Sequence, residues 1–399
     1  RSRDVAPPIW HRAQGNSLHK KTDGNALPYD TQRTVFTTDP IAAAFYGSLW
    51  SRCKVPQPKP YEMAYIRNRR REYPNLSHQI TGWLLRLFRV SAADTSYDAK
   101  NAFHSIFIHE LEEQIRQIAR REDVQLLLQR VRYAAISVRT RQGMTDFLIG
   151  QGALPGDALA AHLFRLTYDK AISRWVIHNN GLERGKELIA TDPISGIDVD
   201  LSMSIYADDV RRVTVASDPW TLPGKLKAQD LALTTELNAL GIAQSSTKKE
   251  HVITPFGPAT SRFRGELKRG KLEVHGRMLR YMTVLGSKSH ALGSAEPEIN
   301  ARITAANVGW HTMGPFWTSG VSIKVRKLIF FAIVYNALIS GLEVYVLTKA
   351  QLERLDSYIV GKCRIILKGA ASTKDTNGKV ISSLSNAAVI RRLGFVPVP

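Results

Sequence analysis

Two aspartates stand side by side in a stretch that otherwise has the composition of β-strand. Residues 203–216 read MSIYADDVRRVTVA, with Asp208 and Asp209 near the centre. Asp is depleted in strands, and adjacent carboxylates repel each other unless a cation or solvent screens them. The stretch therefore predicts two short strands hinged at the aspartate pair, which is either a solvated turn or a place where something positive binds.

The charge of the whole chain favours a polyanionic partner. The 399 residues include 55 Lys and Arg against 35 Asp and Glu, a net charge of +20. Such a field points to nucleic acid first and to an anionic membrane surface second. Only two cysteines occur, Cys53 and Cys363, without a Cys or His partner at metal spacing. This argues against a disulfide scaffold or zinc finger and fits a reducing compartment inside the cell, nuclear or cytoplasmic.

The longest apolar run, residues 328–342, predicts a buried helix rather than a membrane span. It contains Asn336 and Ser340 and is shorter than the roughly 20 residues that a span needs. We therefore expect no membrane partner. The N-terminal residues contain no apolar signal segment, and the first residue, Arg1, suggests a fragment or a processed product.

The chain reads as a mixed region followed by a helical one. Residues 1–60 are rich in Pro, Gly, Asn and Thr and predict an irregular lead-in. Helical and strand-like patterns alternate up to about residue 290, and the pattern from there on is all helix. This order predicts an α+β unit with a helical appendage. The run YIRNRRREYPN at 65–75 is either a solvated face or a surface that binds phosphates and stacks on bases.

Three segments stand in a definite order around the aspartate pair. Asp98 ends a strand in YDAKNAF, a Gly/Pro loop opens a helix within 151–164 with Asp157 as its N-cap, and the hairpin follows at 206–209. Two Asp-bearing strands side by side would gather carboxylate oxygens, the natural ligands of Mg²⁺. Neighbouring side chains on a strand point to opposite faces, so Asp208 and Asp209 have different roles unless the turn bends them together.

These segments resemble the conserved blocks of reverse transcriptases. YADD at 206–209 is similar to the family's YxDD motif, DAKNAF at 98–103 to its first catalytic block, and QGALPGDALAAHLF at 151–164 to the block that opens the helix beneath the incoming nucleotide. Downstream, SSTKKEHV at 245–252, VLGSKSHALGSAEPEINARITAA at 284–306 and the helical segment at 325–369 resemble later blocks of the non-LTR (LINE-type) retrotransposon enzymes. The resemblance covers about residues 75–395.

The resemblance implies a right-hand polymerase fold with an antiparallel-sheet palm on a ferredoxin-like core, partial fingers and a helical thumb. It divides the chain into the lead-in 1–60, partial fingers 61–97, a palm with inserted fingers helices 98–290 and a thumb 291–399. It implies two Mg²⁺ ions, with Mn²⁺ as a substitute, and RNA template, DNA primer and dNTPs as partners. It gives no indication of an obligate protein partner.

The resemblance also implies a role for individual residues. The metal ligands would be Asp98, Asp208 and Asp209, and Lys248 would protonate the leaving pyrophosphate. Phe103 would act as a steric gate against a ribose 2′-hydroxyl. The nucleotide pocket would further include Gln151, Gly152 and Tyr206, and the primer grip Leu285 and Gly286. Some of the arginines at 67–71 would contact the triphosphate.

The sequence departs from the family pattern at a few positions. Arg211 and Arg212 follow the aspartate pair where the family has apolar residues, and two in succession force one toward the packed face. Lys248 and Lys249 are expected to be exposed, and so are Lys324, Arg326 and Lys327. The leading hypothesis is an RNA-directed DNA polymerase of a non-LTR retrotransposon. The alternatives are a decayed or domesticated relative that binds nucleic acid without turnover and, third, a maturase-like protein.

Overall fold

The computed structural model describes residues 5–19, 32–70, 72–140, 143–179, 188–245, 247–290 and 292–394. The chain divides into two compact units. One comprises Arg1–Arg71 with Phe88–Leu279, and the other comprises Glu72–Leu87 with Arg280–Pro399. We call them the sheet unit and the helical unit and describe each by itself. Strands and helices are mixed along the chain, so the prediction of an α+β fold is confirmed.

A five-stranded sheet forms the centre of the sheet unit, in the order β13-β12-β3-β10-β9. The strands are β3 (Ser91–Tyr97), β9 (Met203–Tyr206), β10 (Asp209–Ala216), β12 (Glu250–Thr254) and β13 (Arg277–Met278). β10 is antiparallel to both β3 and β9, and β12 is antiparallel to β3. With the helices α6 (Ala158–Asn179) and α7 (Leu222–Ala239), the chain order is β3-α6-β9-β10-α7-β12. This is the β-α-β-β-α-β arrangement in which two crossover helices cover one face of the sheet.

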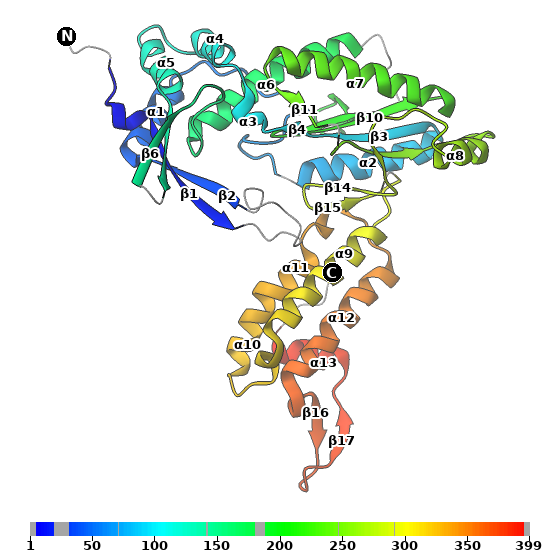
Figure 1. The fold of residues 1–399 in the computed structure, drawn as a ribbon. Helices are drawn as coiled ribbons and strands as arrows, with labels where there is room; N and C mark the ends of the chain where they lie inside the picture. The colour runs from blue at the N-terminus through cyan, green and yellow to red at the C-terminus, as the bar shows by residue number, and fades with distance from the viewer. Residues whose placement is uncertain are drawn as a thin grey trace. The chain divides into compact units, whose positions relative to one another are not determined.

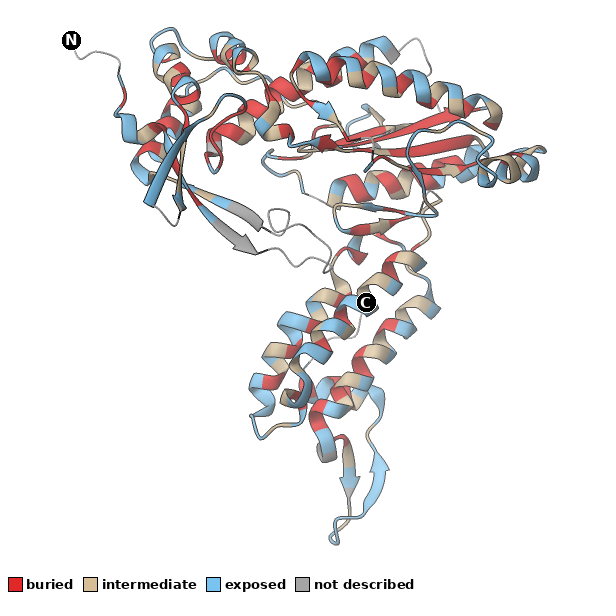
Figure 2. Cartoon of the chain, in the orientation of Figure 1, coloured by how far each residue is buried: buried red, intermediate tan, exposed pale blue. Residues whose placement is uncertain are grey.

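The core of the sheet unit lies between this sheet and its helices. Figure 1 shows α6 and α7 on one face of the sheet, and the indole of Trp175 on α6 donates a hydrogen bond to the carbonyl of Gln229 on α7 at 2.9 Å. In Figure 2, β3 and β10 are buried along almost their whole length. Tyr97, Ile205 and Val210 pack into this core. The two central strands therefore lie in the core of the sheet unit.

A second sheet of the sheet unit corrects the expectation for residues 1–60. Its order is β2-β1-β5-β6, formed by β1 (Arg12–His19), β2 (Gln32–Thr38), β5 (Ala135–Thr140) and β6 (Gly143–Leu148). Helix α1 (Pro40–Ser51) follows, with the Asp39 carboxylate accepting from the amides of Ile41 and Ala42 at 2.9 Å. The prediction of an irregular lead-in is wrong, because β1 gains its order from pairing with β5 more than a hundred residues away.

The remaining elements of the sheet unit are short. They are α3 (Ala102–Ser105), α4 (Ile108–Ile118), α5 (Val124–Arg132), α8 (Thr260–Lys268) and the small pairs β4 (Ala99–Lys100) with β11 (Ala243–Gln244) and β7 (Ile189–Thr191) with β8 (Asp198–Asp200). The predicted boundary between residues 97 and 98 would cut the central sheet immediately after β3. The structure therefore assigns β3 to the same unit as the hairpin and not to a separate fingers segment.

The helical unit contains most of the helices predicted after residue 290. They are α9 (Glu296–Met313), α10 (Ile323–Ile329), α11 (Asn336–Ile339), α12 (Lys349–Leu367) and α13 (Asn386–Leu393), and α2 (Glu72–Phe88) joins them. Two hairpins complete the unit: β14 (Met282–Val284) with β15 (Ser287–Ser289), and β16 (Ser372–Lys374) with β17 (Val380–Ser383). The region is therefore not all helix, and Glu72–Leu87, which is less than half of the segment 61–97 predicted as fingers, belongs to this unit.

The apolar helix of this unit is longer and less buried than the sequence predicts. A π-helical turn, Phe330–Tyr335, joins α10 to α11. The stretch Ile323–Val344 has 22 residues and is long and apolar enough to cross a membrane by length and composition. Of its most apolar 18-residue segment, 28% is buried. Phe330, Val334 and Leu338 face the core, whereas Leu328 is 66% exposed. The prediction that this helix is buried is wrong, and so is the prediction that it is too short to span a membrane.

Candidate active site

The aspartate pair lies on a tight hairpin, as the sequence predicts. Tyr206 pairs with Asp209 across β9 and β10, so Ala207 and Asp208 form a two-residue turn. Ala207 has φ of +59°, in the left-handed region where the first turn residue of such hairpins is normally Gly. A non-glycine residue held there stores strain, and strained backbone is concentrated at functional sites.

Asp98 lies at the same edge of the sheet as this turn. Tyr97, the last residue of β3, pairs with Val210 of β10, so Asp98 leaves β3 where β10 begins. The backbone carbonyl of Asp98 accepts a hydrogen bond from the Ser245 amide at 2.8 Å, which fixes the chain after the strand. Two strands that are distant in sequence thus bring Asp98, Asp208 and Asp209 into one acidic cluster.

The electrostatics of the acidic cluster show that its members act on one another. Removal of solvent by the surrounding protein, followed by the charges of Asp208 and Asp98, raises the pKa of Asp209 to about 6. Burial, and then the charge of Asp98, also raises the pKa of Asp208. Asp209 keeps access to solvent, since the residue as a whole is exposed. A cluster in which neighbouring carboxylate charges raise the pKa of Asp208 and of Asp209 is an environment that favours a bound cation.

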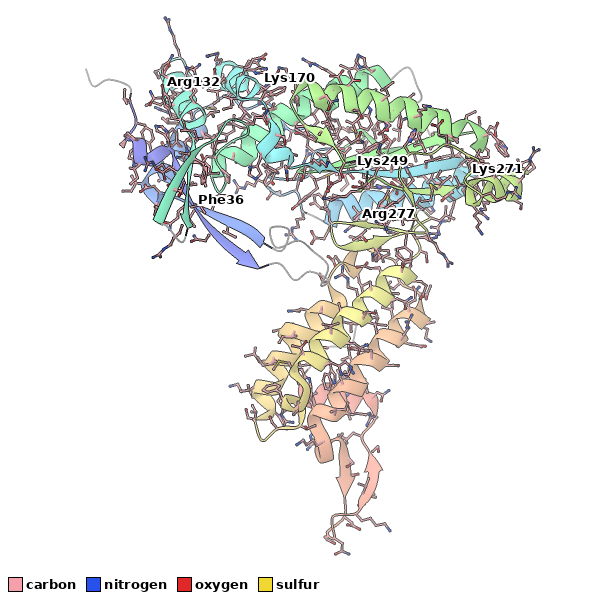
Figure 3. The ribbon with its side chains drawn as sticks, viewed as in Figure 1. Phe36, Arg132, Lys170, Lys249, Lys271 and Arg277 are labelled. Carbon is pink, nitrogen blue, oxygen red and sulfur yellow. The ribbon has the colours of Figure 1, made fainter. Side chains whose placement is uncertain are left out.

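Lys248 is the cation that reaches the acidic cluster. Its Nζ lies 3.0 Å from Oδ2 of Asp98, and its charge lowers the pKa of both Asp208 and Asp209. Lys249 differs from the expectation of an exposed side chain. It is 4% exposed, forms an ion pair with Asp230 on α7 and is labelled in Figure 3. Of the two lysines, the structure therefore directs only Lys248 to the acidic cluster.

Gly152 and Phe103, two of the residues predicted to line the nucleotide pocket, lie close together. Gly152 has φ of +76°, and a β-carbon there would lie 2.5 Å from the carbonyl oxygen of Phe103. The Gly152 amide donates to the carbonyl of Ile106 at 2.7 Å, so the 151–157 loop is fastened to the segment after Asp98. The absence of a side chain is what permits this approach. Gln151 beside it is exposed, and Tyr206 is half-buried at the end of β9.

The predicted N-cap Asp157 is confirmed. Its carboxylate accepts from the Leu159 amide at 3.3 Å and forms a buried ion pair with Arg130 at 2.8 Å. The start of α6 is thereby anchored to α5, which holds the loop in place.

An aromatic row that the sequence reasoning missed runs from the protein surface to the acidic cluster. The ring of Phe103 stacks on Phe164 with centroids 3.9 Å apart, and Phe164 stacks on Tyr168 at 5.1 Å. The Tyr168 hydroxyl donates to the backbone carbonyl of Asp208 at 3.3 Å. At the other end, Tyr65 meets Phe103 edge-on at 6.1 Å. The spacing of Phe164 and Tyr168 on α6 could have indicated a shared helix face, but nothing local placed Tyr65 there.

The two arginines after the aspartate pair are both buried, at 4% and 6% exposure. Arg211 donates from Nε and Nη2 to the carboxylate of Asp94 on β3, at 2.9 Å and 3.0 Å. Arg212 places its guanidinium 4.7 Å from the ring centroid of Trp175 on α6. Each charge has a partner within the fold, so neither side chain projects into the acidic cluster.

The predicted primer-grip residues belong to the helical unit. Leu285 and Gly286 form the two-residue turn between β14 and β15, with φ of +49° and +82°. The guanidinium of Arg302 donates to the Gly286 carbonyl at 3.0 Å and holds the turn against α9. Arg326, expected on a wet face, is buried instead and donates to the carbonyls of Trp317 and Ile366.

The arginines at 67–71 have different surroundings. Arg69 donates to the carbonyls of Lys59 and Glu62 and holds that loop closed. Arg67 and Arg70 are exposed, and Arg71 lies outside the described residues.

The acidic cluster supplies the oxygen donors that a hard divalent cation requires. In the described part of the chain, no three His, Cys, Asp or Glu side chains are grouped closely enough to enclose a metal ion. The three aspartates still fit such an ion by donor type and by their mutual repulsion, which a cation would relieve.

No protein-family model matches this sequence, and no curated protein matches it. Among solved structures, the fold is similar to apo telomerase from Candida tropicalis, with 10% identity, a TM-score of 0.47, and coverage of 91% of this chain and 64% of that one. It is also similar to telomerase from Candida albicans in complex with a TWJ fragment of telomeric RNA, with 9% identity, a TM-score of 0.44, and coverage of 92% and 62%. The chain thus spans less than two thirds of these telomerase chains, and the similarity is too low to assign a role to any residue.

Proposed function

We propose that the protein is an RNA-directed DNA polymerase of the non-LTR retrotransposon type, which adds nucleotides to a primer 3′-hydroxyl. The observation that supports this is the acidic cluster, in which Asp98, Asp208 and Asp209 meet at one edge of the central sheet, and in which burial together with the charge of Asp98 raises the pKa of Asp208 and of Asp209. An RNA template, a DNA primer and dNTPs would be the partners, and the net charge of +20 suits their phosphates. The proposal places the protein inside the cell, in the nucleus or cytoplasm.

The three aspartates would hold two Mg²⁺ ions, which when bound supply the positive charge that in-line phosphoryl transfer needs at the attacking and leaving oxygens. Lys248 is proposed to give a proton to the departing pyrophosphate, which requires its ammonium to leave Asp98. Phe103 is proposed to exclude a 2′-hydroxyl, with Gln151, Gly152 and Tyr206 beside it. Leu285 and Gly286 are proposed to support the primer end.

Primer extension on an RNA template with Mg²⁺ tests the proposal. We expect the parent protein to extend a DNA primer and Asp208→Asn to lose extension by at least about a thousandfold, since the ion would lose a charged ligand. Asp146→Asn is the matched control, because Asp146 is 44% exposed and belongs to β6 of the second sheet. Equal extension by the parent and Asp208→Asn would refute the assignment of the site.

A second candidate function is binding of nucleic acid without turnover. The contact that favours it is the ion pair between Lys248 and Asp98, in which a lysine of the chain itself neutralises one carboxylate of the acidic cluster. This candidate predicts RNA binding that weakens as salt rises, no nucleotide incorporation, and no change in affinity in Asp98→Asn. Loss of RNA binding in that variant would argue against it.

A further inference from the structure

A loop that precedes the central sheet in sequence continues the sheet beyond β9. The Tyr61 carbonyl accepts from the Ile205 amide and the Met63 amide donates to the Ile205 carbonyl, both at 2.8 Å. We call residues 59–65 the strap. Because the strap pairs with the strand that leads into the turn, its end at Tyr65 is held in register with Ala207 and Asp208.

Polar contacts fix the strap more firmly than an ordinary surface loop. Glu62 is 5% exposed; its carboxylate accepts from Arg165 on α6 at 3.1 Å and from the Lys59 amide at 2.7 Å. Arg69 donates to the carbonyls of Lys59 and Glu62 and closes the loop. A buried ion pair whose partners are further hydrogen-bonded defines one conformation, since breaking it leaves a buried charge unpaired.

Tyr65 is therefore presented in a fixed and costly conformation. Its φ is +59°, a region that bulky residues rarely occupy, and yet 44% of its surface is exposed. Its ring stands at 89° to that of Phe103 with centroids 6.1 Å apart. Together with Phe164, Tyr168 and Ala207, it lines one cavity beside the hairpin turn. The contacts of the strap hold Tyr65 in this strained conformation, and strained backbone is concentrated at functional and ligand-binding sites.

We propose that Tyr65 is a specificity-determining residue that forms the second wall of the sugar pocket, at right angles to Phe103. This inference rests on the proposed polymerase function and extends it. Two perpendicular rings form an apolar corner that accepts the C2′ methylene of a deoxyribose. A ribose 2′-hydroxyl in the same corner would lose its hydration without gaining a partner, and this penalty is the basis of discrimination.

Single-nucleotide incorporation tests the proposal by comparing kcat/KM for a dNTP with that for the matching rNTP. In Tyr65→Ala we expect the discrimination between them to fall by about tenfold or more, and in Tyr65→Phe we expect it to stay near that of the parent, because the ring is retained. Tyr133→Ala is the matched control, since Tyr133 is 58% exposed and lies outside the site. If Tyr65→Ala does not fold, Tyr65→Gly, which relaxes the positive φ, takes its place.

The outcomes separate the two proposals. Unchanged discrimination in Tyr65→Ala, or an equal loss for dNTP and rNTP, overturns the sugar-wall role while leaving the polymerase function standing. If the parent incorporates nothing, the polymerase function fails, and equilibrium titration with dATP and ATP in Mg²⁺ decides the inference. Tighter binding of dATP that Tyr65→Ala abolishes would support it, and equal or absent binding in the parent would overturn it.

Discussion

The ion pair between Arg211 and Asp94 makes a sharp prediction about stability. Both side chains are almost fully buried, at 4% and 2% exposure, and two guanidinium nitrogens of Arg211 donate to the carboxylate. Replacing Arg211 with Met keeps an unbranched apolar side chain, although a shorter one, and removes the charge. The carboxylate of Asp94 then loses the hydrogen bonds and the positive charge that Arg211 supplies.

The expected loss of stability follows from the removal of that partner. Breaking a buried pair by removing one partner costs about 3–5 kcal/mol, whereas replacing both partners with apolar residues is close to neutral. We expect Arg211→Met to lower the free energy of unfolding by about 4 kcal/mol and the melting midpoint by about 10 °C. The double variant Arg211→Met with Asp94→Val should recover most of this loss.

A double-mutant cycle in urea, followed by circular dichroism, measures the coupling. The control is the exposed pair Lys227–Glu273, whose side chains are 60% and 67% exposed, where Lys227→Met should change stability by less than about 0.5 kcal/mol. If Arg211→Met costs under about 1 kcal/mol, or if the double variant loses the sum of both single losses, the reasoning from burial is wrong.

Three further predictions concern the candidate site. Gly152→Ala should lose more than about 1 kcal/mol in chemical denaturation, because φ is positive and the new carbon meets a carbonyl; Gly150→Ala, which meets nothing within 4 Å, should not. Because the pKa of Asp209 is raised in the native state, this carboxyl stays protonated in the native state between about pH 4 and about pH 6 while it ionises in the unfolded state. The free energy of unfolding therefore falls as pH rises through this range. Without divalent ions, the free energy of unfolding of Asp209→Asn should therefore rise relative to that of the parent by about 1 kcal/mol over that range, after screening by solvent. A difference in urea midpoints that stays constant with pH would contradict this. Lys248→Ala should raise the pKa of Asp209 further, as NMR titration would show; an unchanged or lower value would mean that the ammonium does not act on it.

The sequence predicted two local structures around the candidate site, because the signals for them are local. The hairpin at 206–209 and the cap at Asp157 depend on residues a few positions apart, and both are confirmed. The N-terminal strands were missed because β1 is stabilised by β5, from Arg12 to Ala135. The position of Arg211 could not be settled either, since its partner Asp94 lies 117 residues earlier. Tyr65 depends on a strap whose pairing with Ile205 no local pattern reveals.

The pairing of Arg211 with Asp94 has a consequence for folding as well as for stability. Asp98 directly follows the end of β3 and β10 begins at Asp209, so the alignment of these strands decides whether the acids meet. A slip by one residue would shift the strands by about 3.3 Å and turn each side chain to the opposite face. Arg211 and Asp94 would then be buried apart from each other, and the misaligned sheet would be less stable than the native one. The pair therefore stabilises the strand alignment in which the acidic cluster is assembled over alignments shifted by one residue.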